Sequence, residues 1–129
     1  MTKKNKFSIP FERLKRSVLG KDFELSLVFA DDKLSRRLNR IYRGKNKPAN
    51  VLSFPLSKKS GEIFIDLITA EKEAPRYGLS YRDFVKLLFV HGLLHLKGMR
   101  HGRKMERTEK KLLYGTSSLN GHRHRNLRN

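Results

Sequence analysis

The chain contains no cysteine and no tryptophan, and its acidic residues are few. The lack of thiols excludes disulfide bonds and thiolate metal sites, so a metal ion would need histidine or carboxylate ligands. No apolar run approaches the roughly 20 residues of a transmembrane helix, and the N-terminal sequence Met-Thr-Lys-Lys-Asn-Lys lacks the apolar stretch of a signal peptide. These absences predict a cytoplasmic protein without a membrane partner.

Basic residues dominate the charge that is present. Lysine and arginine number 30 against 12 aspartate and glutamate residues, which gives a formal net charge of +18. Such an excess on a small domain favours a polyanionic partner, most commonly a nucleic acid. The alternative interpretation is a basic surface that is merely solvated.

Length and apolar content favour one folded domain with a tail. Leucine, isoleucine, valine and phenylalanine supply 37 of the 129 residues, well above the share typical of a disordered chain. We assign residues 1–115 to a single domain. Residues 116–129 are polar, basic and aperiodic, and we expect them to form a flexible tail.

Hydrophobic periodicity predicts a mixture of helices and strands. Helical patterns or capping signals mark residues 7–19, the segment after Asp31-Asp32, the segment closed by Pro75, residues 80–97 and residues 103–114. Strand patterns mark residues 23–30, 50–55 and 62–66, with a hairpin loop at 58–61. In the helix after Asp32, we expect Leu34, Leu38 and Ile41 to face the core. The fold class is therefore α/β (α+β with a mixed sheet), and we expect a small four-stranded sheet packed with about five helices.

Three of the five histidines lie in the stretch Val-His-Gly-Leu-Leu-His-Leu-Lys-Gly-Met-Arg-His-Gly, residues 90–102. His91 and His95 are four residues apart, so both project from one face of a helix and can reach one ion. Gly98 is typical of a helix end, and a turn there would bring His101 back as a third ligand. Three nitrogen ligands leave a fourth position for water or substrate, which is typical of a catalytic zinc site. Histidines that are only hydrogen-bonded, or that contact RNA phosphates, remain the alternatives.

The residue after the first histidine bears on which class of hydrolase the motif could belong to. Zinc proteases of the His-Glu-x-x-His type take their general base from that position. Gly92 occupies it here and can accept no proton, which argues against a peptidase. A glycine at this position could instead permit close packing of the backbone.

A second candidate for function lies in the basic turn that follows a predicted helix. Arg43 stands there among Arg40, Lys45 and Lys47. Its planar guanidinium stays charged and donates two hydrogen bonds, which suits a phosphate group. The alternative is an ordinary solvated arginine.

Together these motifs resemble the YbeY family, a group of bacterial endoribonucleases and rRNA maturation factors. The resemblance rests on residues 42–55 (Tyr-Arg-Gly-Lys-Asn-Lys-Pro-Ala-Asn-Val-Leu-Ser-Phe-Pro), on Gly-Glu-Ile at 61–63, and on the histidine motif, and it covers roughly residues 20–114. It implies an α/β fold, one zinc ion held by His91, His95 and His101, and a functional, catalytic role for Arg43. It also implies a metal-dependent hydrolase that cleaves single-stranded RNA in rRNA processing and ribosome quality control.

The expected partners are accordingly rRNA and the ribosomal subunit, without DNA, and the expected oligomeric state is a monomer. The competing hypothesis is a non-catalytic, zinc-containing rRNA-binding protein that acts in ribosome assembly. Attack on the phosphodiester could come from water activated by the metal or from the RNA 2′-hydroxyl, and the sequence offers no obvious general base.

Two departures from the family pattern bear on the site. The family usually has aspartate directly before the third histidine, where this chain has Arg100. A carboxylate there could orient a ligand, whereas Arg100 could contact phosphate. The segment from His101 to Met105 also looks shorter than usual, so the final helix is expected to pack differently.

Overall fold

The computed structural model describes residues 6–114, and the tail expected over residues 116–129 lies outside them. In chain order the elements are α1 (Phe11–Leu19), β1 (Glu24–Ala30), α2 (Asp32–Arg43), β2 (Val51–Ser57), β3 (Ser60–Asp66), α3 (Leu67–Glu73), the 3-10 helix η1 (Ala74–Tyr77), α4 (Tyr81–Leu96) and α5 (Arg103–Tyr114). Within this part of the chain, none of the helices combines the length and apolar content needed to cross a membrane.

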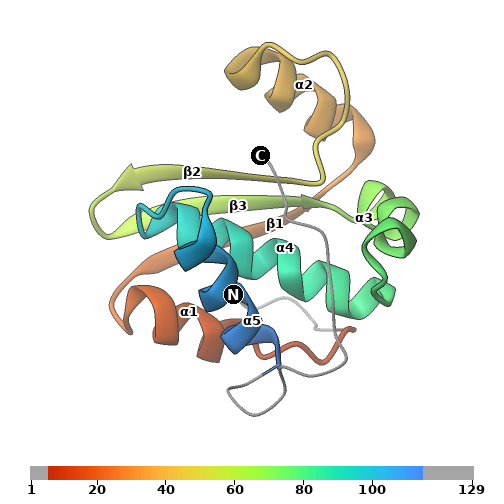
Figure 1. The fold of residues 1–129 in the computed structure, drawn as a ribbon. Coiled ribbons are helices and arrows are strands. Elements are labelled where there is room, and N and C mark those ends of the chain that lie inside the picture. The colour runs from red at the N-terminus through yellow and green to blue at the C-terminus, as the bar shows by residue number, and fades with distance from the viewer. Residues whose placement is uncertain (1–5, 115–129) are drawn as a thin grey trace.

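The strands form one mixed sheet in the order β1-β3-β2 (Figure 1). The central strand, β3, pairs in parallel with β1 and antiparallel with β2, to which a tight hairpin joins it. The predicted mixed α/β fold is confirmed, but residues 6–114 contain three strands rather than the expected four. The physical reason is that the other apolar stretches among these residues carry helical spacing instead of strand alternation.

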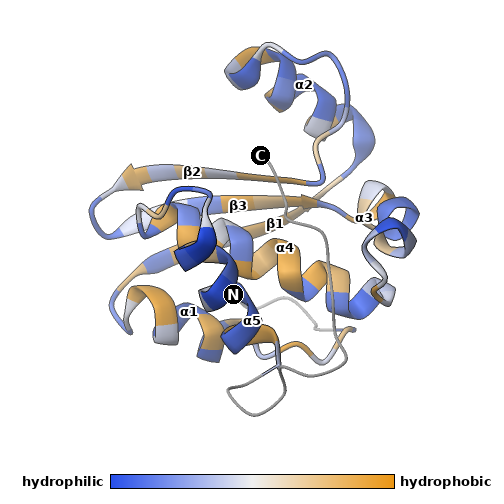
Figure 2. Ribbon diagram, viewed as in Figure 1, coloured by the Kyte–Doolittle hydropathy of each residue, from blue (hydrophilic) through white to orange (hydrophobic). Residues whose placement is uncertain are grey.

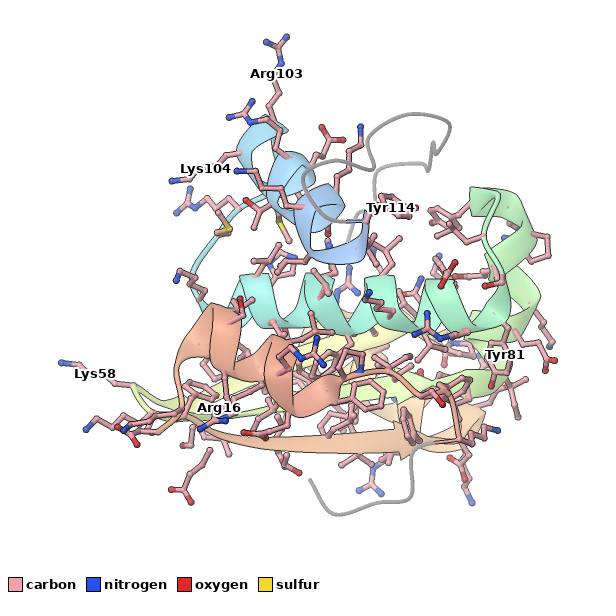
Figure 3. The ribbon with its side chains drawn as sticks, turned by 90° about the horizontal axis from the view of Figure 1, so that it is seen from below. Arg16, Lys58, Tyr81, Arg103, Lys104 and Tyr114 are labelled. Carbon is pink, nitrogen blue, oxygen red and sulfur yellow. The ribbon has the colours of Figure 1, made fainter. Side chains whose placement is uncertain are left out.

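The core lies between the sheet and α4. This helix is apolar around nearly its whole circumference, and every residue from Leu87 to Leu94 is buried. Beneath it, Ile63 and Ile65 of β3 are fully buried. Figure 2 shows the apolar colouring concentrated along α4, whereas α2 is largely polar. Helices α1 and α5 flank α4 (Figures 1 and 3), and α2 stands on the opposite side of the sheet (Figure 1).

The first helix lies within the predicted range, residues 7–19. It starts at Phe11, directly after Pro10. Proline disfavours the helical conformation of the residue before it, so Ile9 cannot continue a helix into Pro10. Phe7 and Ile9 are nevertheless buried and extend the core beyond the helix.

The second helix corrects another expectation. It begins as predicted, with the Asp31 carboxylate accepting a hydrogen bond from the Leu34 amide at 2.8 Å. However, Ile41 is 56% exposed, and the buried residues of this helix are Ser35 and Asn39. The inner face of α2 is polar because it packs on the following loop through hydrogen bonds and not on the main apolar core.

Candidate metal centre and substrate cavity

His91 and His95 lie one turn apart on α4, at the end of the helix that reaches β2 and β3. Their Nε2 atoms are 3.1 Å apart, with His91 buried and His95 half-buried. Between them, Gly92 faces β3, where an added Cβ would lie 3.0 Å from Cδ1 of Ile63. Gly92 therefore lets α4 approach the sheet closely, and this close approach sets how near the imidazoles of His91 and His95 lie to the sheet.

The turn after α4 brings the third histidine to the pair. Gly98 adopts φ +98°, and the Gly98 and Met99 amides donate to the carbonyls of His95 and Leu94, both at 2.9 Å. A left-handed residue at this position is favourable for glycine, so the chain reverses here. The exposed His101 ring then lies 5.2 Å from the His91 ring and 5.0 Å from the His95 ring, measured between centroids. The clustering expected from the spacing is thus present.

A buried carboxylate from α5 orients the innermost histidine. Nδ1 of His91 lies 2.6 Å from Oε2 of Glu109, and the two side chains are 1% and 2% exposed. With Glu109 ionised, Nδ1–H of His91 donates to it, and Nε2 is left with its lone pair directed toward His95 and His101. Lys86 of α4 donates to the carbonyl of Leu113 at 3.3 Å, which helps to hold α5 in place.

His95 is kept neutral by its surroundings. Burial lowers the pKa of its imidazole from 6.5 to about 4, and the neighbouring His91 and His101 act in the same direction. A neutral imidazole offers a lone pair near pH 7, which is the form that binds a metal ion.

The donor set fits a metal ion. One ligand nitrogen from each of His91, His95 and His101 can be chosen so that all three lie within 4.8 Å of one another. In a tetrahedral zinc site with bonds of roughly 2.0–2.1 Å, two ligand nitrogens are about 3.3 Å apart, close to the separation seen between His91 and His95. His101 is exposed, so its side chain has room to close the remaining distance. The cluster could therefore hold one ion.

Arg43 reaches the same region from the end of α2. The helix stops there because Gly44 adopts φ +69° and its amide donates to the carbonyl of Arg40. Ser35 exchanges two 2.7 Å hydrogen bonds with the backbone of Ala49, and the Asn39 amide donates to the Lys47 carbonyl at 2.9 Å. These bonds tie the loop to α2 and fix how Arg43 lies beside the start of β2.

A cavity of about 410 Å³ runs along the β2 edge of the sheet between α2 and α4. Its lining combines an arginine, two histidines, two aromatic rings and the backbone of β2: Tyr42, Arg43, Val51, Leu52, Ser53, Phe54, Pro55, His91, Gly92 and His95. Arg43 and two of the three clustered histidines thus face one space, although they are about fifty residues apart in the sequence. A volume of this size suits a small ligand or one nucleotide unit of a longer chain.

The sequence interpretation missed Glu109. The available signal was its place on the buried stripe of α5, four residues after Met105, where a glutamate needs a partner. Glu109 supplies an orienting carboxylate of the kind that the family pattern places directly before the third histidine. Arg100, which occupies that position here, is exposed.

Several known proteins are similar to this chain. The family described as Endoribonuclease YbeY matches residues 4–116. Curated relatives named Endoribonuclease YbeY include those of Persephonella marina (41% identical over 95 residues, 67% of this chain and 60% of the relative), Aquifex aeolicus (41% over 101 residues, 73% and 67%) and Methylocella silvestris (44% over 89 residues, 64% and 51%). The chain thus spans between about half and two thirds of their lengths.

The fold also matches a solved structure. The solution structure of TM1509 from Thermotoga maritima superposes with a TM-score of 0.63 at 23% identity, over 89% of this chain and 84% of that one. This likeness concerns the arrangement of helices and strands. The family match, in contrast, spans both the segment that carries Arg43 and the segment that carries the histidine cluster. On the strength of that match, the chain belongs to the YbeY family.

Proposed function

We propose that this protein is a zinc-dependent endoribonuclease that cleaves single-stranded RNA in rRNA processing and ribosome quality control. The observation that carries the proposal is a single cavity lined by Arg43 and by His91 and His95 of the histidine cluster. The relatives' name, Endoribonuclease YbeY, supports the reaction. The net charge of +18 supports a polyanionic substrate.

In this proposal the three histidines bind the metal ion and Arg43 neutralises charge on the substrate. His91, His95 and His101 would hold the ion through three neutral nitrogens, which leaves one position of a tetrahedral site open. When bound, zinc supplies Lewis-acid chemistry that stabilises negative charge on phosphoryl and attacking oxygens. Arg43 donates hydrogen bonds to the non-bridging phosphate oxygens, holding the phosphodiester in the cavity and neutralising the charge that builds up on it.

Two routes of attack remain for the nucleophile. Among the described residues that line the cavity there is no aspartate or glutamate. The general base is therefore not a carboxylate of the cavity lining. Attack by water leaves a linear phosphate end, whereas attack by the RNA 2′-hydroxyl leaves a 2′,3′-cyclic phosphate. Mass spectrometry of the cleavage products distinguishes the two routes.

The test compares RNA cleavage by wild type, Arg43→Ala and the double variant His91→Ala with His95→Ala, each incubated with zinc. We expect Arg43→Ala to lower kcat by roughly 10²- to 10³-fold, as for loss of one donor to transition-state charge, with zinc content unchanged. The double variant should lose both zinc and cleavage. Arg37→Ala is the matched control, because it removes an exposed arginine from the same helix outside the cavity.

RNA binding is measured alongside cleavage at low and at high salt. Zinc-loaded wild type that cuts no RNA, yet binds it with affinity that falls steeply with salt, would identify the protein as a non-catalytic rRNA-binding factor. Equal loss of activity in Arg43→Ala and Arg37→Ala would remove Arg43 from the proposed mechanism.

A further inference from the structure

Three aromatic rings form a row that ends at the wall of the cavity. Tyr42 of α2 packs on Phe54 of β2, with centroids 4.9 Å apart and ring planes tilted by 53°. Phe54 in turn packs edge-to-face on Phe64 of β3, with centroids 5.8 Å apart. Since Ile63 and Ile65 face α4, the strand alternation places Phe64 on the other side of the sheet, where α2 lies. Phe54 and Phe64 therefore support the Tyr42 ring on its side toward the sheet.

Tyr42 is unusual in remaining open to solvent at the end of this row. Tyr42 is 64% exposed, although its ring packs on Phe54 and both residues line the cavity. A tyrosine that served only to anchor α2 would be expected to bury more of its ring. One face of a positioned aromatic ring is thus available next to Arg43, the residue that follows it in the chain.

The chemistry around this ring fits an unpaired nucleobase. Bases of single-stranded RNA stack on aromatic side chains, while the backbone phosphates contact arginine and lysine. Here the exposed ring of Tyr42 and the guanidinium of Arg43 line one cavity, and Lys45 and Lys47 follow in the same loop. A base that is paired in a duplex has both of its faces stacked on neighbouring bases, so it cannot also stack on an aromatic side chain.

We propose that Tyr42, backed by Phe54, stacks against the unpaired base of the nucleotide whose phosphate Arg43 contacts. The proposal deepens the proposed function and rests on it, because it places RNA in the same cavity. The proposal assigns the preference for single-stranded RNA to Tyr42, because only a base that is not stacked in a duplex can stack on the Tyr42 ring.

The absence of tryptophan from the chain permits a direct test. Tyr42→Trp introduces a single indole at the proposed stacking position. The zinc-loaded full chain is titrated with a single-stranded 2′-O-methyl RNA hexamer, which lacks the free 2′-hydroxyl, and with an abasic hexamer that carries the same phosphates. We expect the base-containing hexamer to quench the emission of the introduced indole at saturation, and the abasic hexamer to leave it nearly unchanged. Ile68→Trp is the matched control, since Ile68 is 49% exposed on α3, outside the cavity.

Affinity in variants that alter the ring itself gives the second readout. Tyr42→Phe should bind the hexamer within about twofold of wild type, whereas Tyr42→Leu should bind roughly 5- to 150-fold more weakly, the range for loss of one stacked base. Binding of the abasic hexamer should be equal in all three proteins. An anchoring role alone would predict equal effects on both hexamers.

The outcomes distinguish failure of the proposed stacking site from failure of the proposed nuclease function. Equal quenching by the two hexamers, or wild-type affinity in Tyr42→Leu, would overturn the stacking site even if the wild type cleaves RNA. Base-dependent quenching in a protein that cuts no RNA would uphold the stacking site and reject the nuclease. Failure of both hexamers to bind would overturn both, and would point to a protein partner for the exposed ring.

Discussion

Glu109 is the residue whose removal tests the metal centre most directly. It contacts His91 at 2.6 Å in a site where both side chains are almost fully buried, and it belongs to a different helix. Replacing it with glutamine keeps the size of the side chain and one acceptor oxygen but removes the negative charge. The substitution therefore probes how the carboxylate orients His91 and supports its basicity, with little change in packing.

The expected magnitude follows from this geometry. Loss of a carboxylate that orients a metal-binding histidine typically lowers metal affinity by about 10- to 100-fold, or roughly 1.4–2.8 kcal/mol. We expect Glu109→Gln to fall in this range. Glu109→Ala should also destabilise the metal-free protein by about 1–3 kcal/mol, because Nδ1–H of His91 would be left without an acceptor in a site closed to water.

Zinc affinity is measured by competition with a chromogenic chelator, and stability by urea denaturation of the metal-free protein. Glu106→Gln is the control, since it makes the same change on α5 at a partly exposed position one turn earlier. It should leave zinc affinity close to that of wild type. Equal zinc affinity in Glu109→Gln and Glu106→Gln would refute the role assigned to the buried carboxylate.

Two further predictions concern the framework of the site. Gly92→Ala should lower the free energy of unfolding by about 1 kcal/mol, because overpacking against Ile63 outweighs the gain in helix propensity. In an Ile63→Val background, which lacks the Cδ1 atom in closest contact, the loss should become smaller; additive losses in urea denaturation would contradict this. Burial, followed by the nearby Asp32, raises the pKa of Asp66 above 3.8, so the folded state binds this proton more tightly than the unfolded state does. Its ionisation therefore weakens the fold as the pH rises through the raised pKa. Asp66→Asn should match or exceed wild type in stability at pH 7, with the advantage shrinking toward about pH 4; a difference independent of pH would count against this assignment.

The parts of the molecule that the sequence predicted well depend on neighbours along the chain. The spacing of His91 and His95, the glycine turn at Gly98 and the cap at Asp31 are local features, and each is present as expected. Helix periodicity and backbone capping act over four or five residues, so a sequence shows them directly. Composition likewise determined the basic charge and the lack of thiol ligands.

Contacts between distant segments were decided only by the tertiary structure. The helix pattern of α2 suggested that Ile41 faces the core, but the helix packs on its own loop, so Ser35 and Asn39 are buried in its place. No spacing rule connects Glu109 with His91 on another helix, or Arg43 with a cavity that the histidines share. Such contacts are set by how α2, α4 and α5 pack around the sheet, and this packing depends on the shape and burial of the whole core rather than on any local pattern.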